Sequence, residues 1–243
     1  MNPMVRHRLD DGDPLWESVS SLGILTEGDQ AQAVLFRDQQ QRLALEVPSY
    51  NPFFIDFVKP SEQRKFRTFG RGQMFAKALG VGKGTESAVD LTAGLGQDSM
   101  FMAALGLSVV ALEREPFVYL LLKDALDRAG EAGGYIAEVT GRIQLKLIEA
   151  EGFLTGEPPK ADVYYLDPMF PDKKKSALSQ KGMQILQKLV DNPPAEPLIE
   201  VALNAGARRV LLKRPVKAPV LGKPAHQYRG ERVRYDLYIS SSG

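Results

Sequence analysis

The sequence contains no cysteine and only two histidines among its 243 residues. The absence of cysteine excludes disulfides, thiolate metal sites and cysteine nucleophiles, and it suits a reducing compartment. The two histidines, His7 and His226, form no H-E-x-x-H or similar metal-binding pattern. No apolar run reaches the roughly 20 residues that span a bilayer, and the N-terminus lacks the apolar segment of a secretory signal. We therefore expect a cytoplasmic protein that binds neither a metal nor a membrane.

Basic and acidic side chains are nearly equal in number, but they are unevenly distributed along the chain. The net charge is +1, yet residues 90–166 carry 6 basic and 12 acidic side chains, whereas residues 167–243 carry 14 basic and 7 acidic ones. A basic final third suits a partner that carries phosphates, provided that these charges cluster in space. The alternative is an ordinary solvated surface rich in lysine.

Strand-like and helical segments alternate from residue 80 onward. Strands are predicted over residues 87–92, 107–113, 142–150, 161–167 and 207–214, and helices over residues 97–106, 115–134, 176–190 and 195–206. Such alternation implies right-handed crossovers and a mostly parallel sheet that is covered on both faces. The last segment, residues 226–240, turns at Arg229-Gly230 and could close the sheet with an antiparallel edge strand.

The first part of the chain has a different pattern, with short strands joined by turns. Strands are predicted over residues 23–28, 33–38, 42–47 and 53–58, and the polar run 39–41 forms a hairpin loop. A glycine-rich linker begins at Gly80. We therefore predict a small, β-rich α+β subdomain over residues 1–79, in a position to contact RNA, and a doubly wound, Rossmann-like α/β domain over residues 80–243.

A glycine turn follows the first strand of the larger domain, in the sequence DLTAGLGQD (90–98). Ligands of doubly wound sheets bind beyond the carboxyl ends of the strands. Gly94 and Gly96 would let the backbone pass close to such a ligand before the next helix begins. Glu113 ends the second strand, where a carboxylate can bind the two hydroxyls of a ribose. These features favour a nucleotide-like cofactor over an ordinary tight turn with surface acids.

Two cofactors compete for this turn. A dinucleotide site prefers G-x-G-x-x-G, but Ser99 occupies the position of the third glycine. S-adenosylmethionine carries a cationic sulfonium and a ribose diol instead of phosphates, so its site favours carboxylates, which Asp90, Asp98 and Glu113 would supply. We favour S-adenosylmethionine. A nicotinamide-dependent oxidoreductase and a binding module without catalysis are the alternatives.

The fourth strand of this domain ends on an acid, in the sequence VYYLDPMFP (163–171). Asp167 could accept a hydrogen bond from an exocyclic amine, and the carbonyl of Pro168 could accept a second. The flanking prolines restrict the backbone, which would present Phe170 as a platform on which a planar base stacks. We therefore expect Asp167, Pro168 and Phe170 to be the catalytic residues of a methyltransferase that acts on the amino group of a nucleobase.

Basic residues lie on both sides of this acidic middle segment. Positive side chains near a base would neutralise the phosphates that flank it. We expect an RNA channel around the pocket to be lined by Lys65, Arg67, Arg71, Lys173, Lys174, Lys175, Lys213 and Arg214.

Four motifs together resemble one known family. DLTAGLGQD, ALERE (111–115), YLDPMFPDKKKSAL (165–178) and LLKRPVKAP (211–219) are similar to sequences of the ribosomal RNA small subunit methyltransferase J family, and the resemblance runs from about residue 50 to the end. It implies a class I S-adenosylmethionine-dependent methyltransferase fold. It also implies methylation of the exocyclic N2 of a guanosine in 16S ribosomal RNA, free or in the 30S particle, with S-adenosylhomocysteine as the product.

The resemblance also implies cofactor contacts. By motif these fall on Gln97, Asp98, Glu113, Arg114, Glu151, Gly152 and Asp167. Glu151 and Gly152 depart from the small hydroxyl residues of the family, although Glu151 could still bind the adenine amine. Because related enzymes use similar D/N-P-P-x loops, the alternative acceptors are adenine N6, DNA or a protein glutamine.

Overall fold

This computed structural model of the chain describes residues 5–10, 12–22, 32–156, 158–168, 189–190 and 196–240. Within these ranges two β-sheets form, one with seven strands and one with three. No helix of the described ranges is long and apolar enough to cross a lipid bilayer.

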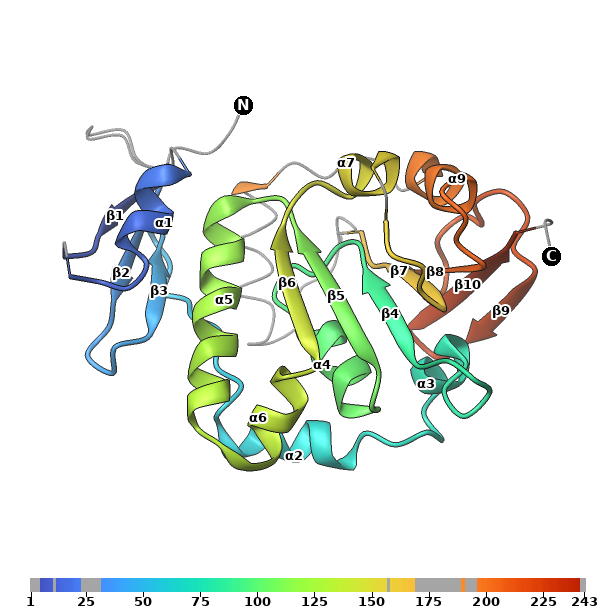
Figure 1. Cartoon of the computed structure of the whole chain (residues 1–243), viewed down its shortest axis with the longest axis horizontal. Helices are drawn as coiled ribbons and strands as arrows, with labels where there is room; N and C mark the ends of the chain where they lie inside the picture. Colours follow the sequence, from blue (N-terminus) through green and yellow to red (C-terminus); the bar gives the residue numbers. More distant parts are fainter. Residues whose placement is uncertain are drawn as a thin grey trace.

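The seven-stranded sheet has the strand order β6-β5-β4-β7-β8-β10-β9 (Figure 1). Its parallel strands are β4 (Ser87–Asp90), β5 (Ser108–Glu113), β6 (Ile143–Leu147), β7 (Val163–Leu166) and β8 (Arg209–Pro215). At the end of the chain, β10 (Val233–Ile239) is antiparallel to both β8 and β9 (His226–Arg229). The doubly wound α/β fold and its antiparallel C-terminal edge are therefore confirmed.

The strand order reverses at β4, which fixes where a ligand can bind. From β4 the chain proceeds outward through β5 and β6 on one side, and then returns to β7 and β8 on the other. The crevice of a doubly wound sheet lies beyond the carboxyl ends of the two strands at this switch point. Residues that follow β4 and β7 are thus in the position that binds ligands.

Helices cover both faces of the large sheet. One face packs against α2 (Pro60–Thr68), α3 (Met74–Leu79), α4 (Gln97–Ala104), α5 (Pro116–Glu131) and α6 (Gly134–Thr140), and the other against α7 (Ala150–Thr155) and α9 (Glu196–Asn204). Side chains of a strand alternate between faces, so Val163 and Tyr165 enter the first core while Tyr164 and Leu166 enter the second. The strand is buried on both sides, as expected for a central parallel strand.

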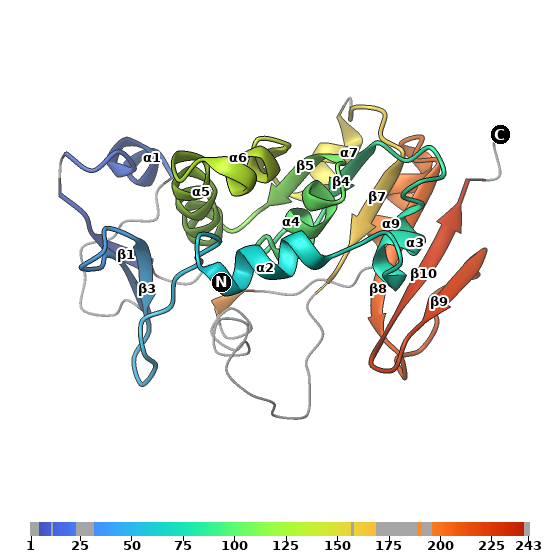
Figure 2. The same cartoon turned by 90° about the horizontal axis from the view of Figure 1, so that it is seen from below.

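The three-stranded sheet consists of β1 (Val5–Arg8), β2 (Ala33–Arg37) and β3 (Leu43–Glu46), with α1 (Trp16–Ser21) between β1 and β2. It lies beside α5, at the end of the molecule opposite β9 (Figures 1 and 2). Buried leucines of β2 and β3 belong to the same apolar core as the inner face of α5. The predicted boundary at residue 80 stays a prediction, and the described residues on its two sides share one core.

Several predicted elements need correction. The hairpin of β2 and β3 is confirmed, but residues 53–58 form a single bridge, between Phe53 and Leu45, instead of a strand. The carbonyl of Ile55 there accepts a hydrogen bond from Arg128 of α5 at 2.6 Å, so a side chain replaces a strand partner. β6 is shorter than predicted, because α7 begins at Ala150. The predicted strand 23–28 and most of the predicted helix 176–190 lie outside the described residues.

A buried carboxylate joins the small sheet to the large domain. Asp124 of α5 is 5% exposed and accepts hydrogen bonds from the backbone N–H of Leu43 at 3.2 Å and from Arg128 Nε at 2.8 Å. It also forms an ion pair with Arg37 of β2, whose Nε lies 2.7 Å from Asp13 Oδ2. Because two guanidinium groups and one backbone N–H converge on a single acid, the position of the small sheet against α5 depends on that acid.

Replacing Asp124 with asparagine should therefore destabilise the protein. Removal of one partner of a buried ion pair typically costs several kcal/mol, and we expect about 3 kcal/mol in the free energy of unfolding by urea. The matched control is Asp127→Asn, one turn along α5, where the exposed pair with Lys123 at 2.6 Å should contribute about 0.5 kcal/mol or less. Equal losses in the two variants would contradict the role assigned to Asp124.

Candidate active site

Four of the predicted acidic residues lie at the carboxyl edge of the large sheet. Asp90 ends β4, Glu113 ends β5, and Asp167 directly follows β7. Asp98 lies in the first turn of α4, which begins beyond the end of β4. The structure thus brings together side chains that are up to 77 residues apart in the sequence.

The two glycines of the turn after β4 have different surroundings. Both have positive φ angles, +51° at Gly94 and +76° at Gly96. A Cβ atom added at Gly96 would overlap Leu122 of α5, so close packing of the turn requires this glycine. A Cβ atom added at Gly94 would meet nothing closer than the carbonyl oxygen of Thr92, at 3.9 Å. The open side of Gly94 is where a ligand could approach the backbone.

Glu113 connects this turn to the start of α5. Its Oε2 accepts a hydrogen bond from the Gly94 N–H at 3.0 Å, and its Oε1 accepts from the N–H groups of Arg114 and Glu115, both at 2.8 Å. Burial raises the pKa of the Glu113 carboxyl, while these backbone donors oppose the rise. A carboxylate has about four acceptor positions, so with three in use Glu113 can still accept from one hydroxyl of a ribose, at Oε2.

Asp90 lies beneath the turn and supports it. Its side chain accepts hydrogen bonds from Ser99 Oγ at 2.6 Å and from the Thr92 N–H at 3.1 Å, and the residue is 1% exposed. Burial raises the pKa of this carboxyl to about 7. The sequence predicts a direct cofactor contact for Asp90, whereas its burial assigns it to shaping the turn. Ser99, which stands where a dinucleotide site has its third glycine, is the partner that holds it.

A lysine bridges the other two acids. Lys213 of β8 places its Nζ 2.7 Å from Asp98 Oδ2 and 2.9 Å from Asp167 Oδ2. The hydroxyl of Tyr165 also donates to Asp98 Oδ2, at 2.6 Å, and the backbone N–H of Asp167 donates to Thr92 Oγ1 at 2.7 Å. These contacts fix Asp167 from both its backbone and its side chain. The sequence predicts that Lys213 binds RNA, but in the structure its ammonium group lies between Asp98 and Asp167.

The titration of these groups reflects their burial. Burial raises the pKa of Asp167 to about 6; the positive charge of Lys213 opposes that rise and the neighbouring Asp98 adds to it. Burial alone would lower the pKa of the Lys213 ammonium, but the two carboxylates outweigh that effect and raise it above its ordinary value. Lys213 is therefore charged throughout the physiological range. Asp167 changes its protonation state closer to neutrality than an ordinary aspartate.

The other predicted cofactor contacts follow the same edge. Gln97 begins α4 and lies 3.4 Å from Glu62 of α2, measured from Nε2 to Oε2. Arg114 follows β5, with Glu149 Oε1 3.5 Å from its Nη1. The exposed residues Glu151 and Gly152 lie in the first turn of α7, just after β6, and Pro168 is buried after β7. Phe170 lies outside the described residues.

The five described residues of the predicted RNA channel do not form a single surface. Arg214 is 7% exposed and lies on the opposite face of β8 from Lys213, because neighbouring residues of a strand alternate between faces. Arg67 packs over the ring of Tyr135, 4.8 Å from its centre, at the start of α6 and thus at the amino edge of the sheet. Lys65 and Arg71 are exposed on and after α2. Lys173, Lys174 and Lys175 lie outside the described residues.

Sequence reasoning missed two supporting residues, Thr92 and Tyr165. Tyr165 precedes Asp167 by two positions on one strand, so both point to the same face. The two-residue spacing, which puts Tyr165 on the face of Asp167, could have been noticed in the sequence. Asp98 of α4, the acid that Tyr165 binds, is already among the predicted site residues. Nothing local in the sequence indicates that Thr92 accepts the N–H of Asp167, since this contact depends on how β4 pairs with β7.

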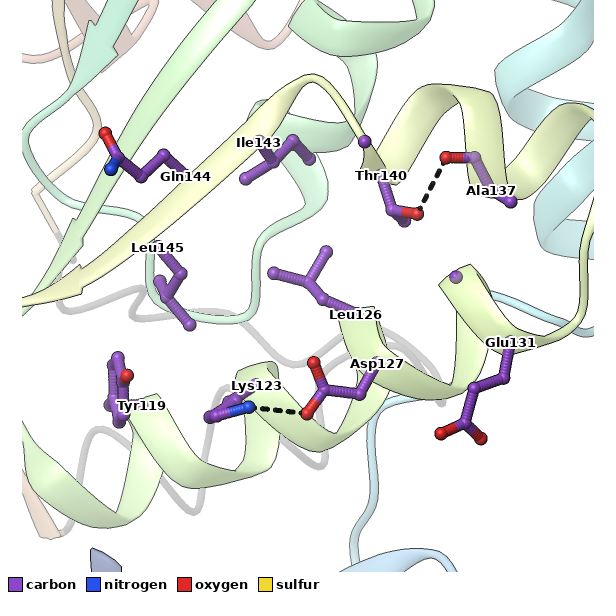
Figure 3. A pocket seen from close by; sticks show the side chains of 12 residues that line it. Tyr119, Lys123, Leu126, Asp127, Glu131, Ala137, Thr140, Ile143, Gln144 and Leu145 are labelled. Atoms are coloured by element: carbon purple, nitrogen blue, oxygen red, sulfur yellow. Dashed lines mark hydrogen bonds and ion pairs between the residues drawn. The ribbon is translucent and has the colours of Figure 1, made fainter.

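A hollow lies away from this group of acids. It has a volume of about 710 Å³ and is lined by α5, α6 and the edge strand β6, including Tyr119, Lys123 and Gln144 (Figure 3). None of the predicted site residues lines it. Across the described part of the chain, no group of three or more histidine, aspartate or glutamate side chains is arranged to hold a metal ion.

Comparisons with known proteins agree with this geometry. A family model described as "Putative SAM-dependent methyltransferase" matches residues 19–240. The Ribosomal RNA small subunit methyltransferase J of Chromohalobacter salexigens is 39% identical over 246 aligned positions, which cover 95% of each chain. The protein of the same name from Thioalkalivibrio sulfidiphilus is 42% identical over 207 positions, covering 82% of this chain and 80% of the relative.

A solved structure has the same fold over nearly the whole chain. The crystal structure of an S-adenosylmethionine-dependent methyltransferase from Neisseria gonorrhoeae is 27% identical, with a TM-score of 0.72, and the match covers 98% of this chain and 96% of the other. These similarities exclude the nicotinamide-dependent oxidoreductase that the glycine turn left open. The chain belongs to the ribosomal RNA small subunit methyltransferase J family, whose members are S-adenosylmethionine-dependent methyltransferases.

Proposed function

We propose that this protein methylates the exocyclic N2 amine of a guanosine in small-subunit (16S) ribosomal RNA. The observation that carries the proposal is the position of Asp167, a hydrogen-bond acceptor held at the switch point of the sheet beside the glycine turn. The name of the relatives that match over most of the chain supports ribosomal RNA as the substrate. The choice of guanine N2 follows the family resemblance.

The residues of the crevice fit S-adenosylmethionine by their chemistry. Gly94 leaves an open approach to the backbone, and Oε2 of Glu113 has an acceptor position left for a ribose hydroxyl. The cluster of Asp98, Asp167 and Lys213 carries one net negative charge when ionised, which suits a cationic sulfonium. We propose that the cofactor is held by Gly94, Gly96, Gln97, Asp98, Glu113, Arg114, Glu151, Gly152 and Asp167. When bound, S-adenosylmethionine supplies an electrophilic methyl group and leaves as S-adenosylhomocysteine.

The chain's own contribution to the reaction is mainly orientation. Asp167, as a carboxylate, would accept a hydrogen bond from the guanine amine, and the carbonyl of Pro168 would accept a second. These two acceptors aim the amine nitrogen, whose lone pair is otherwise delocalised into the ring, and holding reactants in such a geometry lowers the barrier. Asp167 is also placed to receive the proton that the nitrogen releases as its new bond to carbon forms.

RNA must present a base that has left its stack before the amine can reach Asp167. We propose that Phe170 stacks on this base, and that Lys173, Lys174 and Lys175, with Lys65 and Arg71, contact the phosphates around it. The N-terminal subdomain is a further surface for RNA. We place the reaction in the cytoplasm, on free ribosomal RNA or on the 30S particle.

Two single variants, Gly94→Ala and Gly96→Ala, distinguish an effect on cofactor binding from an effect on stability. Gly94→Ala should lower the affinity for S-adenosylmethionine at least tenfold by calorimetry, because the new Cβ enters the open side of the turn. Its cost in the free energy of unfolding should be about 1–2 kcal/mol, the strain of a left-handed alanine. Gly96→Ala should lose a further ~1–3 kcal/mol through overlap with Leu122. Wild-type affinity in Gly94→Ala would exclude this binding position.

Methyl transfer should depend on pH through Asp167. Because its pKa is raised to about 6, the acceptor carboxylate becomes a protonated donor as the pH falls through that value, and kcat/KM should fall with it. Asp167→Asn should lower kcat about 100-fold, the scale of a lost acid–base group, and should abolish this acidic limb of the profile. Glu200→Gln, an exposed change on α9, is the control and should keep the wild-type profile. An unchanged acidic limb in Asp167→Asn would reject the assignment.

The acceptor is identified directly by mapping the transferred methyl group. Purified protein is incubated with labelled S-adenosylmethionine and either naked 16S ribosomal RNA or 30S particles that lack the modification. We expect label in one guanosine, as N2-methylguanosine after digestion to nucleosides. Label in N6-methyladenosine or in a ribosomal protein would replace the proposed acceptor with one of the alternatives. If neither naked RNA nor the RNA of the particles became labelled, RNA methylation would be rejected.

A further inference from the structure

The register of β7 and β8 places a lysine level with the proposed catalytic acid. Tyr164 pairs with Val210, Tyr165 with Leu211, and Leu166 with Leu212. Continued by one residue, this register brings Lys213 beside Asp167, on the face that Tyr165 shares. The pairing of the two strands therefore brings the ammonium group and the carboxylate together.

Lys213 links Asp167 to a second element of the site. Its Nζ contacts Oδ2 of Asp167 at 2.9 Å and Oδ2 of Asp98 at 2.7 Å, and 23% of its side chain is exposed. Asp98 is held in turn by the Tyr165 hydroxyl at 2.6 Å. A straight-chain lysine that ends between two anchored carboxylates has little freedom to reach outward to an RNA phosphate.

Lys213 compensates negative charge among the acids of the site. The negative charges of Asp98 and Asp167 raise the pKa of Asp90, and that of Asp98 also raises the pKa of Asp167. Carboxylates that share a poorly solvated site cannot all ionise unless a positive charge compensates them. Among the described residues, Lys213 is the cation whose contacts with both Asp98 and Asp167 are established.

The tyrosines around Lys213 do not take over this role. Tyr235 is level with Lys213 in the β8–β10 pairing and stacks on Phe75 with ring centres 5.2 Å apart. Burial raises the pKa of both Tyr165 and Tyr235. Both remain neutral hydroxyls near neutral pH, so neither carries a charge that could balance the acids.

We propose that Lys213 is a positioning residue for methyl transfer: by bridging Asp98 and Asp167, it keeps Asp167 ionised and aimed at the acceptor amine. This role rests on the proposed function of Asp167 as the acceptor of the amine hydrogen bond. Without the ammonium group, the crevice would retain a proton on Asp167 at neutral pH, and a protonated carboxyl is a donor that cannot receive both the hydrogen bond and the proton.

The first test titrates Asp167 in the full-length protein without RNA or cofactor. Aspartate carboxyl carbons are labelled with ¹³C, and Asp167→Asn identifies the Asp167 signal. Lys213→Met, which keeps an unbranched side chain one atom shorter but removes its charge, should raise the titration midpoint of Asp167 by at least one pH unit. Lys213→Arg should keep the midpoint near that of the wild type. Lys160→Met, an exposed change before β7, is the control and should leave it unchanged.

The second test follows methyl transfer to 16S ribosomal RNA by the same variants. Lys213→Met should move the acidic limb of kcat/KM upward by the shift seen in the titration. Because the pKa of Asp167 starts at about 6, kcat/KM at pH 7 should fall about twofold for a shift of one pH unit and about tenfold for a shift of two. Lys213→Arg should restore much of the rate. RNA affinity should stay within about threefold of the wild type in both, because the ammonium group contacts carboxylates and not phosphates.

The two tests separate this proposal from the proposed function. An unchanged Asp167 midpoint in Lys213→Met overturns the role of Lys213, and a loss of RNA affinity in that variant would then make it a phosphate contact. A shifted midpoint in a protein that methylates no ribosomal RNA would reject the proposed substrate while supporting the bridge.

If Lys213→Met fails to fold, Lys213→Gln provides the same comparison. A midpoint shifted as far in Lys213→Arg as in the neutral variant would also overturn the proposal.

Discussion

The structure depends on how it holds several carboxylates at one edge of a parallel sheet. Parallel strands end together, so Asp90, Glu113 and Asp167 meet at this edge, and α4 adds Asp98. Buried carboxylates are costly unless they are hydrogen-bonded or paired. Three kinds of partner stabilise the four acids here: Ser99 binds Asp90, backbone N–H groups bind Glu113, and Lys213 pairs with both Asp98 and Asp167. The differences between these partners separate the supporting acids from those that can act on a substrate.

A second set of charges holds the two sheets together. Asp124 of α5 receives Arg37 from the small sheet and Arg128 from its own helix, and Arg128 also reaches the carbonyl of Ile55 on the segment that joins the two parts. The helix that receives these contacts begins at Pro116, three residues after Glu113, at the carboxyl edge of the sheet. The small sheet is thus fixed to an element that also shapes the site.

Much of this could be predicted from the sequence, because the signals are local. The alternation of strands and helices predicts the doubly wound sheet, and the glycine turn, Glu113 and Asp167 are found at the expected edge. What could not be predicted depends on pairing between distant strands. In the sequence, Lys213 is not distinguished from the other basic residues of the final third of the chain. Only the pairing of its strand, β8, with β7 shows that it bridges two acids. Likewise, the sequence predicts that Asp90 binds the cofactor, and only the structure shows that its carboxylate is buried and accepts a hydrogen bond from Ser99.

The most direct test of this account is a crystal structure with S-adenosylhomocysteine bound. We expect the adenosine beside the glycine turn and Glu113, with the sulfur directed toward Asp167 at the end of β7. A sulfur directed away from Asp167, or a ligand bound instead in the hollow between α5, α6 and β6, would contradict the account.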